Sequence, residues 1–311
     1  MKLHFLITIS LISFGIKSQN KIISEDILIK NNNIQLPGTL SYIEKKQSQP
    51  LVIFVHGSGN VDRNGNQGNL ANPNYIKLLS EALNNEDIAF YRYDKRTATK
   101  ENLKFLLEGI TLENFVEDVQ LVISNFKNDK RFSEITLIGH SQGSLVAMLA
   151  ITPDVKKYIS IAGAARQIDE VMTSQIKSQN GEAIGNLVES HFKELRTTGN
   201  ITNVNPNLLS IFNKNNLPFF KSWMSYKPEE EIKNIKIPIL ILNGTKDLQV
   251  KVNDAERLYL SSSKSNISII ENMNHVLKTI FKDEDNIKSY TDSTFPLSEG
   301  LISEITKFIN E

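Results

Sequence analysis

Runs of apolar residues alternate with helical stripes along most of the chain from about residue 22. Segments 22–30 and 33–44 predict an antiparallel pair of strands, because the asparagines at 31–33 tolerate the positive φ of a tight turn. Pro37-Gly38 in the second segment predicts a bend or a bulge. Residues 51–55 form a continuous apolar run, which predicts a strand that is buried on both faces. Further strands are predicted at 88–93, 135–138, 155–162, 237–246 and 267–270.

Segments with apolar residues at helical spacing lie between most of these strands. The clearest cover 73–83, 111–125, 253–261 and 297–309, and a further helix is expected directly after Ser141. In the segment 111–125, Thr111 is the expected N-cap and Asn114 occupies the N3 position. Strands that alternate with helices in this way predict an α/β protein whose mostly parallel sheet of eight strands is flanked by helices.

Residues 164–235 interrupt the alternation of strands and helices. Helical patterns at 167–177, 182–196, 207–214 and 219–224 predict a helical cap inserted into the core, which comprises 19–163 and 236–311. The cap contains as many acidic as basic residues, and it also contains several aromatic residues. For each aromatic residue, packing inside the cap is the favoured interpretation. The aromatic residues are Phe212, Phe219, Phe220, Trp223 and Tyr226.

Composition narrows the function classes. The formal net charge is zero, which gives no indication of a nucleic-acid partner, and the absence of cysteine excludes disulfides and a thiol nucleophile. Residues 1–18 have the pattern of a secretory signal, with Lys2 before a mostly apolar run and Ser18 at a plausible cleavage edge. We therefore expect an exported protein, periplasmic or extracellular, with no stable membrane insertion. A buried N-terminal strand or a membrane anchor stays open as an alternative.

The strongest chemical signal is Gly139-His140-Ser141-Gln142-Gly143, which lies between a predicted strand and a predicted helix. It fits the G-x-S-x-G nucleophile elbow, in which the serine occupies a strained turn that exposes its Oγ. Side chains at positions 139 and 143 would collide with such a turn, which explains the two glycines. We expect Ser141 to be the nucleophile.

An oxyanion hole is expected beside it. His56-Gly57-Ser58-Gly59 follows the predicted central strand 51–55, and a glycine-rich loop there lets a backbone N–H approach a substrate oxygen. The N–H of Ser58 is the first choice for one donor, with Gly59 as the alternative. The N–H of Gln142, the residue after the nucleophile, is expected to be the other donor. His56 is interpreted as structural.

Asp247 and His275 are the expected acid and base, because each follows a predicted strand and the chain order is Ser, Asp, His. Neither His140, adjacent to Ser141, nor His191, in the cap, follows the acid. Among the other acids, Asp254 falls inside a helix and Glu271 on the last strand. We expect no metal and no cofactor. The charged trio Asp94-Lys95-Arg96 is interpreted as an ion-pair cluster at a strand end rather than as catalytic.

With these motifs the chain resembles the α/β-hydrolases, from about residue 22 to the end. Within that superfamily it resembles bacterial esterases of the dienelactone-hydrolase and serine-aminopeptidase-like branch. The resemblance implies a capped serine hydrolase that needs no metal. Members of this branch usually have Gly after the Asp-Lys-Arg trio, where this chain has Thr97, so the conformation of that loop is not implied. The matching stretches are 56–59, 62–63, 91–96, 139–143 and 274–278.

The expected reaction is hydrolysis of carboxylic esters with small or medium acyl groups, and the expected partner is therefore a small-molecule ester. Two alternatives stay open: an aminopeptidase or thioesterase with the same triad, and a ligand-binding pseudo-hydrolase without activity. An aminopeptidase needs a carboxylate that recognises the substrate's α-ammonium group. The candidates in the cap are Asp169, Glu170, Glu182, Glu189 and Glu194.

Overall fold

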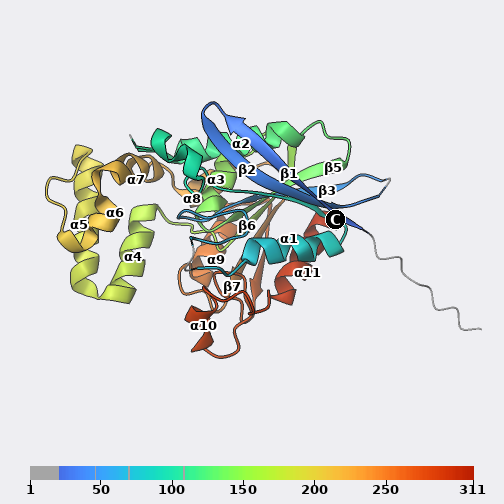
Figure 1. Cartoon of the computed structure of the whole chain (residues 1–311). Coiled ribbons are helices and arrows are strands. Elements are labelled where there is room, and N and C mark those ends of the chain that lie inside the picture. The colour runs from blue at the N-terminus through green and yellow to red at the C-terminus, as the bar shows by residue number, and fades with distance from the viewer. Residues whose placement is uncertain (1–20, 46, 69–70, 108) are drawn as a thin grey trace, which may run out of the picture.

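A single eight-stranded sheet organises the molecule (Figure 1). The structure is a computed structural model that describes residues 21–45, 47–68, 71–107 and 109–311, so the predicted signal at 1–18 lies outside the described residues. The strand order is β1-β2-β4-β3-β5-β6-β7-β8, with β1 and β2 antiparallel to their neighbours and the other pairs parallel. The predicted sheet is therefore confirmed. Its strands are β1 (Ile22–Asn31), β2 (Ile34–Ile43), β3 (Gln49–Val55), β4 (Ala89–Tyr93), β5 (Phe132–His140), β6 (Val155–Ile161), β7 (Ile239–Gly244) and β8 (Ser265–Ile270).

The β1–β2 hairpin forms as its sequence predicts, with Asn32 at φ 53° in the turn. The prediction of a bulge at Pro37-Gly38 is wrong, because the register between β1 and β2 runs unbroken through both residues. Glycine is required at position 38 for a different reason. A Cβ there would lie 2.2 Å from the hydroxyl oxygen of Tyr91, which packs across the strand.

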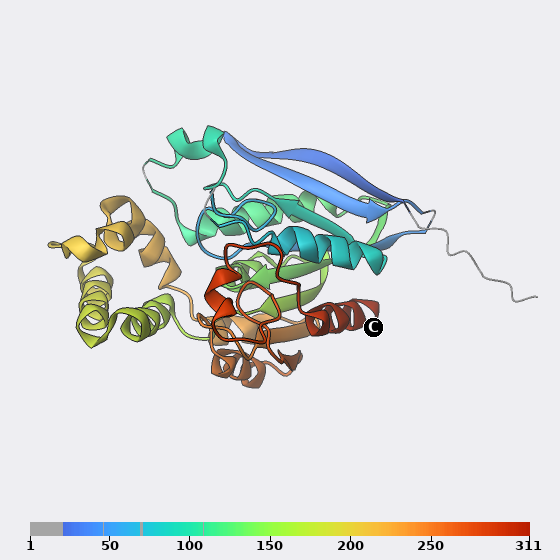
Figure 2. The same ribbon diagram turned by 60° about the horizontal axis from the view of Figure 1, so that its bottom comes forward.

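Helices cover both faces of the sheet. In β3, alternate side chains pack against the helices on opposite faces. Leu51, Ile53 and Val55 pack on one face with the helices α2 (Leu112–Phe126), α3 (Gln142–Ala150) and α9 (Val252–Ser261). Val52 and Phe54 pack on the other face with α1 (Tyr75–Asn85) and α11 (Glu299–Asn310). Figure 2 shows α1 and α11 side by side on that second face. The continuous apolar runs are thus explained by burial on two sides.

Residues 164–235 form a helical cap that stands to one side of the sheet in both views (Figures 1 and 2). The cap has a hydrophobic cluster of its own, in which Phe192 and Phe212 are fully buried. Arg166, at its entry, is fixed to the core through hydrogen bonds to Asp254 of α9. Its α-helices are α4 (Ile168–Asn180), α5 (Glu182–Thr198), α6 (Leu209–Phe212), α7 (Leu217–Trp223) and α8 (Pro228–Glu231).

Some short helical elements were not predicted. Among them are a 3₁₀ helix at Lys100–Phe105, α8 in the cap and α10 (Asp285–Lys288). The α10 segment is held by a buried network, because Asn274 donates to Asn286 (3.0 Å) and to Ser289 (2.7 Å). This network fixes the loop that carries His275. Across the described ranges, no helix is long and apolar enough to cross a membrane.

Candidate active site

Ser141 occupies the sharp turn between β5 and α3, with φ 55° and ψ −121°. A non-glycine residue at positive φ is strained, and the surrounding packing holds it in place. A Cβ at Gly143 would lie 2.1 Å from the carbonyl oxygen of Val55, and one at Gly139 would lie 2.4 Å from that of Gly143. Both glycines are therefore required for α3 to start directly against the end of β3. The predicted elbow geometry is present.

Asp247 and His275 meet across the carboxyl ends of β7 and β8. The Nδ1 of His275 lies 2.8 Å from Oδ2 of Asp247, and both side chains are buried. Oδ1 of Asp247 accepts the backbone N–H groups of Gln249 (2.7 Å) and Val250 (2.9 Å). Burial alone would raise the pKa of the Asp247 carboxyl, but His275 and these two N–H groups outweigh it and lower that pKa. Asp247 is thus held as a carboxylate facing the ring.

His275 lies beside the residue that precedes Ser141. The ring centroids of His140 and His275 are 4.8 Å apart. Nε2 of His140 donates a hydrogen bond to the backbone carbonyl oxygen of His275 (2.8 Å). Nδ1 of His275 is engaged by Asp247, which leaves Nε2 as the nitrogen that can accept a proton. Within the described part of the chain, no hydrogen bond joins Ser141 to His275. Such bonds are commonly long without substrate and tighten when it binds.

The loop after β3 passes beside Ser141. A Cβ at Gly57 would lie 3.2 Å from the Cβ of Ser141, so the loop passes directly against the nucleophile. Gln142 is the first residue of α3, and its N–H therefore has no partner within the helix. Ser58, Gly59 and Gln142 all line the cavity in front of Ser141. Gly59 has φ 93°, which favours glycine, so its conformation differs from that of an ordinary loop residue.

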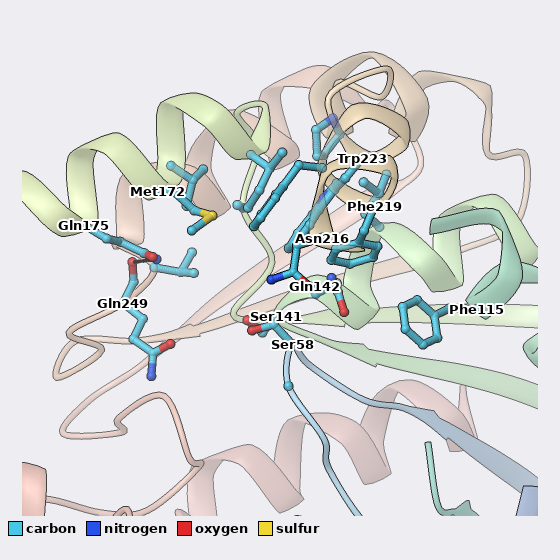
Figure 3. Close-up of a pocket in the computed structure, with 18 of the residues that line it drawn as sticks. Ser58, Phe115, Ser141, Gln142, Met172, Gln175, Asn216, Phe219, Trp223 and Gln249 are labelled. Carbon is cyan, nitrogen blue, oxygen red and sulfur yellow. Dashed lines mark hydrogen bonds between the residues drawn. The ribbon is translucent and has the colours of Figure 1, made fainter. Parts of the chain in front are cut away.

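A cavity of about 440 Å³ opens above Ser141, between the sheet and the cap. Figure 3 shows Phe219 and Trp223 of α7 on one side of it and Met172 and Gln175 of α4 on the other. About half of the lining residues are apolar, and none of the described residues that line the cavity is Asp or Glu. The aromatic residues of the cap are thus divided. Phe212 packs inside the cap as expected, whereas Phe219 and Trp223 also face the cavity.

The two other core histidines are buried and play structural parts. Burial lowers the pKa of His56 and of His140 to about 3, so both rings are neutral at ordinary pH. The ring of His56 packs edge-on against Phe54 and Tyr93, and neither of its nitrogens has a hydrogen-bond partner among the described residues. In the cap, His191 accepts the N–H of Asn205 (3.1 Å).

The charged trio after β4 is only partly the predicted ion-pair cluster. Asp94 pairs with Arg63 (2.9 Å) and Arg96 with buried Asp118 (2.7 Å). For Lys95 the ion-pair interpretation is wrong: its buried ammonium group donates to the carbonyl oxygen of Gly57 and to Oε1 of Gln142, each at 2.8 Å. Burial lowers the pKa of Lys95 to about 7. Sequence reasoning missed this contact because neither acceptor is near Lys95 in the chain.

The candidate carboxylates of the cap do not face the cavity. Asp169 pairs with Arg196, and Lys177 lies within 3.6 Å of both Glu182 and Glu189. Glu194 accepts hydrogen bonds from the hydroxyl and the backbone N–H of Thr202.

Comparison with known proteins agrees with this architecture. The sequence model of the family described as "Serine aminopeptidase, S33" matches residues 69–213. No curated protein matches the sequence. Solved structures with the same fold include an esterase, Pf2001, from Pyrococcus furiosus, with a TM-score of 0.60 and 16% identity over 96% of this chain and 94% of that one.

A second similar structure is Est1E from Butyrivibrio proteoclasticus with ferulic acid bound. It has a TM-score of 0.58 and 17% identity over 91% of this chain and 96% of that one. A third is the α/β hydrolase GrgF from a Penicillium species, with a TM-score of 0.59 and 14% identity over 93% of this chain and 98% of that one. The chain therefore has the α/β-hydrolase fold, as its motifs indicated.

Proposed function

We propose that this chain is a serine hydrolase that cleaves carboxylic esters of small or medium acyl groups, with Ser141, His275 and Asp247 as its triad. The observation that carries the proposal is the strained backbone conformation of Ser141, which lines the cavity between the sheet and the cap. Strain of this kind persists where function requires it. In a nucleophile elbow this conformation exposes the serine Oγ.

In the proposed reaction, Oγ of Ser141 attacks the acyl carbon while Nε2 of His275 takes its proton. Asp247 fixes the ring through Nδ1 and stabilises the imidazolium that forms. The backbone N–H groups of Ser58 or Gly59 and of Gln142 bind the oxyanion, and losing one such donor typically costs about 3–4 kcal/mol of barrier. His275 then gives the proton to the leaving alcohol, and water releases the acyl group by the same steps.

The cavity favours an apolar ester over a free amino acid derivative. About half of the lining residues are apolar, and sites for apolar small molecules combine such residues with polar groups that fix orientation. The ferulic acid bound in Est1E is an aromatic acid, and the aromatic wall of Phe219 and Trp223 would suit such a group.

An aminopeptidase is the second candidate because of the description of the matching family. Its substrate would need a carboxylate against the α-ammonium group, and the described lining residues include no Asp or Glu while they do include Arg166. A thioesterase would use the same triad and the same cavity, so an acyl thioester belongs in any substrate panel.

Replacing Ser141 tests the proposal. Ser141→Ala should lower kcat for p-nitrophenyl butyrate by about 10⁴- to 10⁶-fold and abolish labelling by a fluorophosphonate probe. Ser144→Ala is a matched control in the same helix, because Ser144 is buried and bonded to Tyr158 and Ser160, and it should still be labelled. A Ser141→Ala protein that keeps a tenth of the activity would refute the nucleophile.

Substrate preference distinguishes the esterase hypothesis from the aminopeptidase hypothesis. We expect p-nitrophenyl butyrate to be cleaved readily and alanine or proline p-nitroanilide slowly or not at all. Because many serine hydrolases cleave activated esters, the anilide result is the informative half of the comparison. Efficient anilide cleavage that is lost when one cap carboxylate becomes its amide would favour the aminopeptidase.

A further inference from the structure

The buried amino group of Lys95 contacts both segments that carry the expected oxyanion donors. Its Nζ lies 2.8 Å from the carbonyl oxygen of Gly57 and 2.8 Å from Oε1 of Gln142. Lys95 is only 5% exposed, and its Nζ also lies 4.3 Å from the centre of the Phe115 ring. No part of the reaction described above uses this group.

The first contact acts on the donor at Ser58. The carbonyl oxygen of Gly57 and the N–H of Ser58 belong to one peptide group, which is planar and trans, so the two point in opposite directions. A hydrogen bond that fixes the carbonyl oxygen on Lys95 therefore fixes the direction of the N–H on the opposite side. A cationic donor on the oxygen also polarises the peptide group, which strengthens its N–H as a donor.

The second contact acts on the donor at Gln142. Oε1 of its side chain accepts from Lys95, and its backbone N–H stands at the free start of α3. Holding the side chain restricts the rotation of this residue next to Ser141. A single amino group thus links the two halves of the expected oxyanion hole, which come from the ends of β3 and β5.

The charge of Lys95 is not cancelled by a neighbouring carboxylate. Asp94 is occupied by Arg63, and Asp118 by Arg96, so each adjacent acid already has its own guanidinium partner. Burial lowers the pKa of Lys95 to about 7. An ammonium group has three N–H donors and a neutral amine has two, so both hydrogen bonds persist in either protonation state.

We propose that Lys95 is a positioning residue of the oxyanion hole, which orients and polarises the Gly57–Ser58 peptide group and holds Gln142. The proposal rests on the proposed function of Ser141. It assigns Lys95 no contact with the substrate. Its contribution belongs to the transition state, where charge develops on the oxygen, and so it should appear in kcat rather than in KM.

Lys95→Met tests this, because methionine keeps most of the buried volume and removes the donor. We expect kcat for p-nitrophenyl butyrate to fall by about 10- to 100-fold, somewhat less than for the loss of a donor itself, with KM within about twofold. The affinity for an alkyl trifluoromethyl ketone, whose adduct with Ser141 carries an oxyanion, should fall by a similar factor. The affinity for the matching alcohol, which forms no adduct, should not change.

The matched control is Lys157→Met. Lys157 also donates to a backbone carbonyl, that of Ile309 (2.6 Å), and to Glu134 (3.0 Å), at the far end of the sheet from Ser141. This variant should lose stability but keep kcat and trifluoromethyl ketone affinity. If Lys95→Met matches it within threefold in both measurements, the proposal is overturned. The proposal would also be overturned if Lys95→Met raised KM by the same factor by which it lowered kcat.

Gln142→Met supplies a second route if Lys95→Met does not fold. It removes the Oε1 acceptor and keeps the backbone N–H, and it should lower kcat with an unchanged KM. Where both variants fold, the double variant should be no slower than Lys95→Met alone, because the two residues act through one contact. A Gln142→Met protein with wild-type kcat refutes the link. Failure of the wild type to cleave any ester or react with a fluorophosphonate would instead refute the proposed function.

Discussion

Oδ2 of Asp247 lies 2.8 Å from Nδ1 of His275, while the other oxygen of the same carboxylate accepts two backbone N–H groups. The carboxylate is therefore fixed on both sides before any substrate arrives. This fixed position determines which nitrogen of His275 carries the proton. It leaves Nε2 as the acceptor that the proposed reaction requires.

Asp247→Asn should remove this control while it keeps the size of the side chain. An amide in place of the carboxylate favours the wrong tautomer of His275, and we expect kcat to fall by about 10⁴-fold. Steady-state kinetics with p-nitrophenyl butyrate would measure the fall. Asp283→Asn, which changes an exposed partner of Lys246, is the control and should stay within about twofold of wild type. Less than a tenfold loss in Asp247→Asn would argue against the acid assigned here.

Acid should destabilise the fold through His56 and His140. Their pKa values in the folded chain are about 3, whereas that of histidine in an unfolded chain is about 6.5. Between these values the unfolded state binds more protons, so the free energy of unfolding decreases as the pH falls from about 6.5. Each histidine contributes up to about 1.4 kcal/mol per pH unit.

Urea unfolding of wild type and His56→Leu at pH 7, 6 and 5 measures this effect. Leucine suits the apolar surroundings of Phe54 and Tyr93 and takes up no proton. The variant should therefore lose less stability than wild type over the same pH interval. Parallel curves for the two proteins would show that His56 is not buried in its neutral form.

Gly143→Ala should prevent correct folding or cost more than about 3 kcal/mol of stability. The new Cβ would lie 2.1 Å from the carbonyl oxygen of Val55 and 2.4 Å from that of His56, and backbone atoms cannot move aside cheaply. Gly300→Ala, in helix α11, is the control, because the nearest atom to its Cβ is a side-chain carbon of Ile270 at 3.2 Å. We expect that control to change stability by less than about 1 kcal/mol. Thermal unfolding distinguishes the two cases.

Trp223→Ala should change selectivity more than rate. Trp223 lines the cavity and packs against Phe219, with ring centres 5.4 Å apart. Enlarging the cavity there should lower the ratio of kcat/KM for butyrate over acetate esters by about tenfold, because each methylene in an apolar pocket is worth about 1–3 kcal/mol. The acetate ester serves as the internal control. An unchanged ratio would mean that the apolar group of the ester binds elsewhere in the cavity.

We propose that residues 1–18 direct export and are then removed. The mature protein should start near Gln19 and should be found outside the cytosol, as N-terminal sequencing and cell fractionation would reveal. Replacing the apolar run with polar residues should retain the full-length chain inside the cell. Recovery of a cytosolic protein that begins at Met1 from unmodified cells would refute the proposal.

The strands and the elbow could be predicted because their signals are local. An apolar run such as 51–55 indicates burial on both faces of a strand. The tight turn of five residues leaves no room for side chains at positions 139 and 143, which explains the two glycines. Asp247 and His275 could be found because parallel strands end at one edge of the sheet. Their hydrogen bond then follows from adjacent strands, β7 and β8.

Contacts between distant residues could not be predicted in the same way. Lys95 meets acceptors 38 and 47 positions away, and its neighbours Asp94 and Arg96 suggested an ion pair instead. The Asn274–Asn286 contact likewise gives the short helix α10 a buried polar anchor that no local pattern indicates. In both cases a polar side chain is satisfied by groups that only the folded chain brings near it.

The separate hydrophobic cluster of the cap has a consequence for how such a protein can diversify. Residues such as Phe192 and Phe212 stabilise the cap from within, whereas Trp223 packs against both the cap and the core. Substitutions on the inner wall of α4 or α7 can therefore reshape the binding cavity while the elbow and the Asp247–His275 pair keep their own supports. In the proposed hydrolase, the cap would therefore determine selectivity, while the core would determine reactivity.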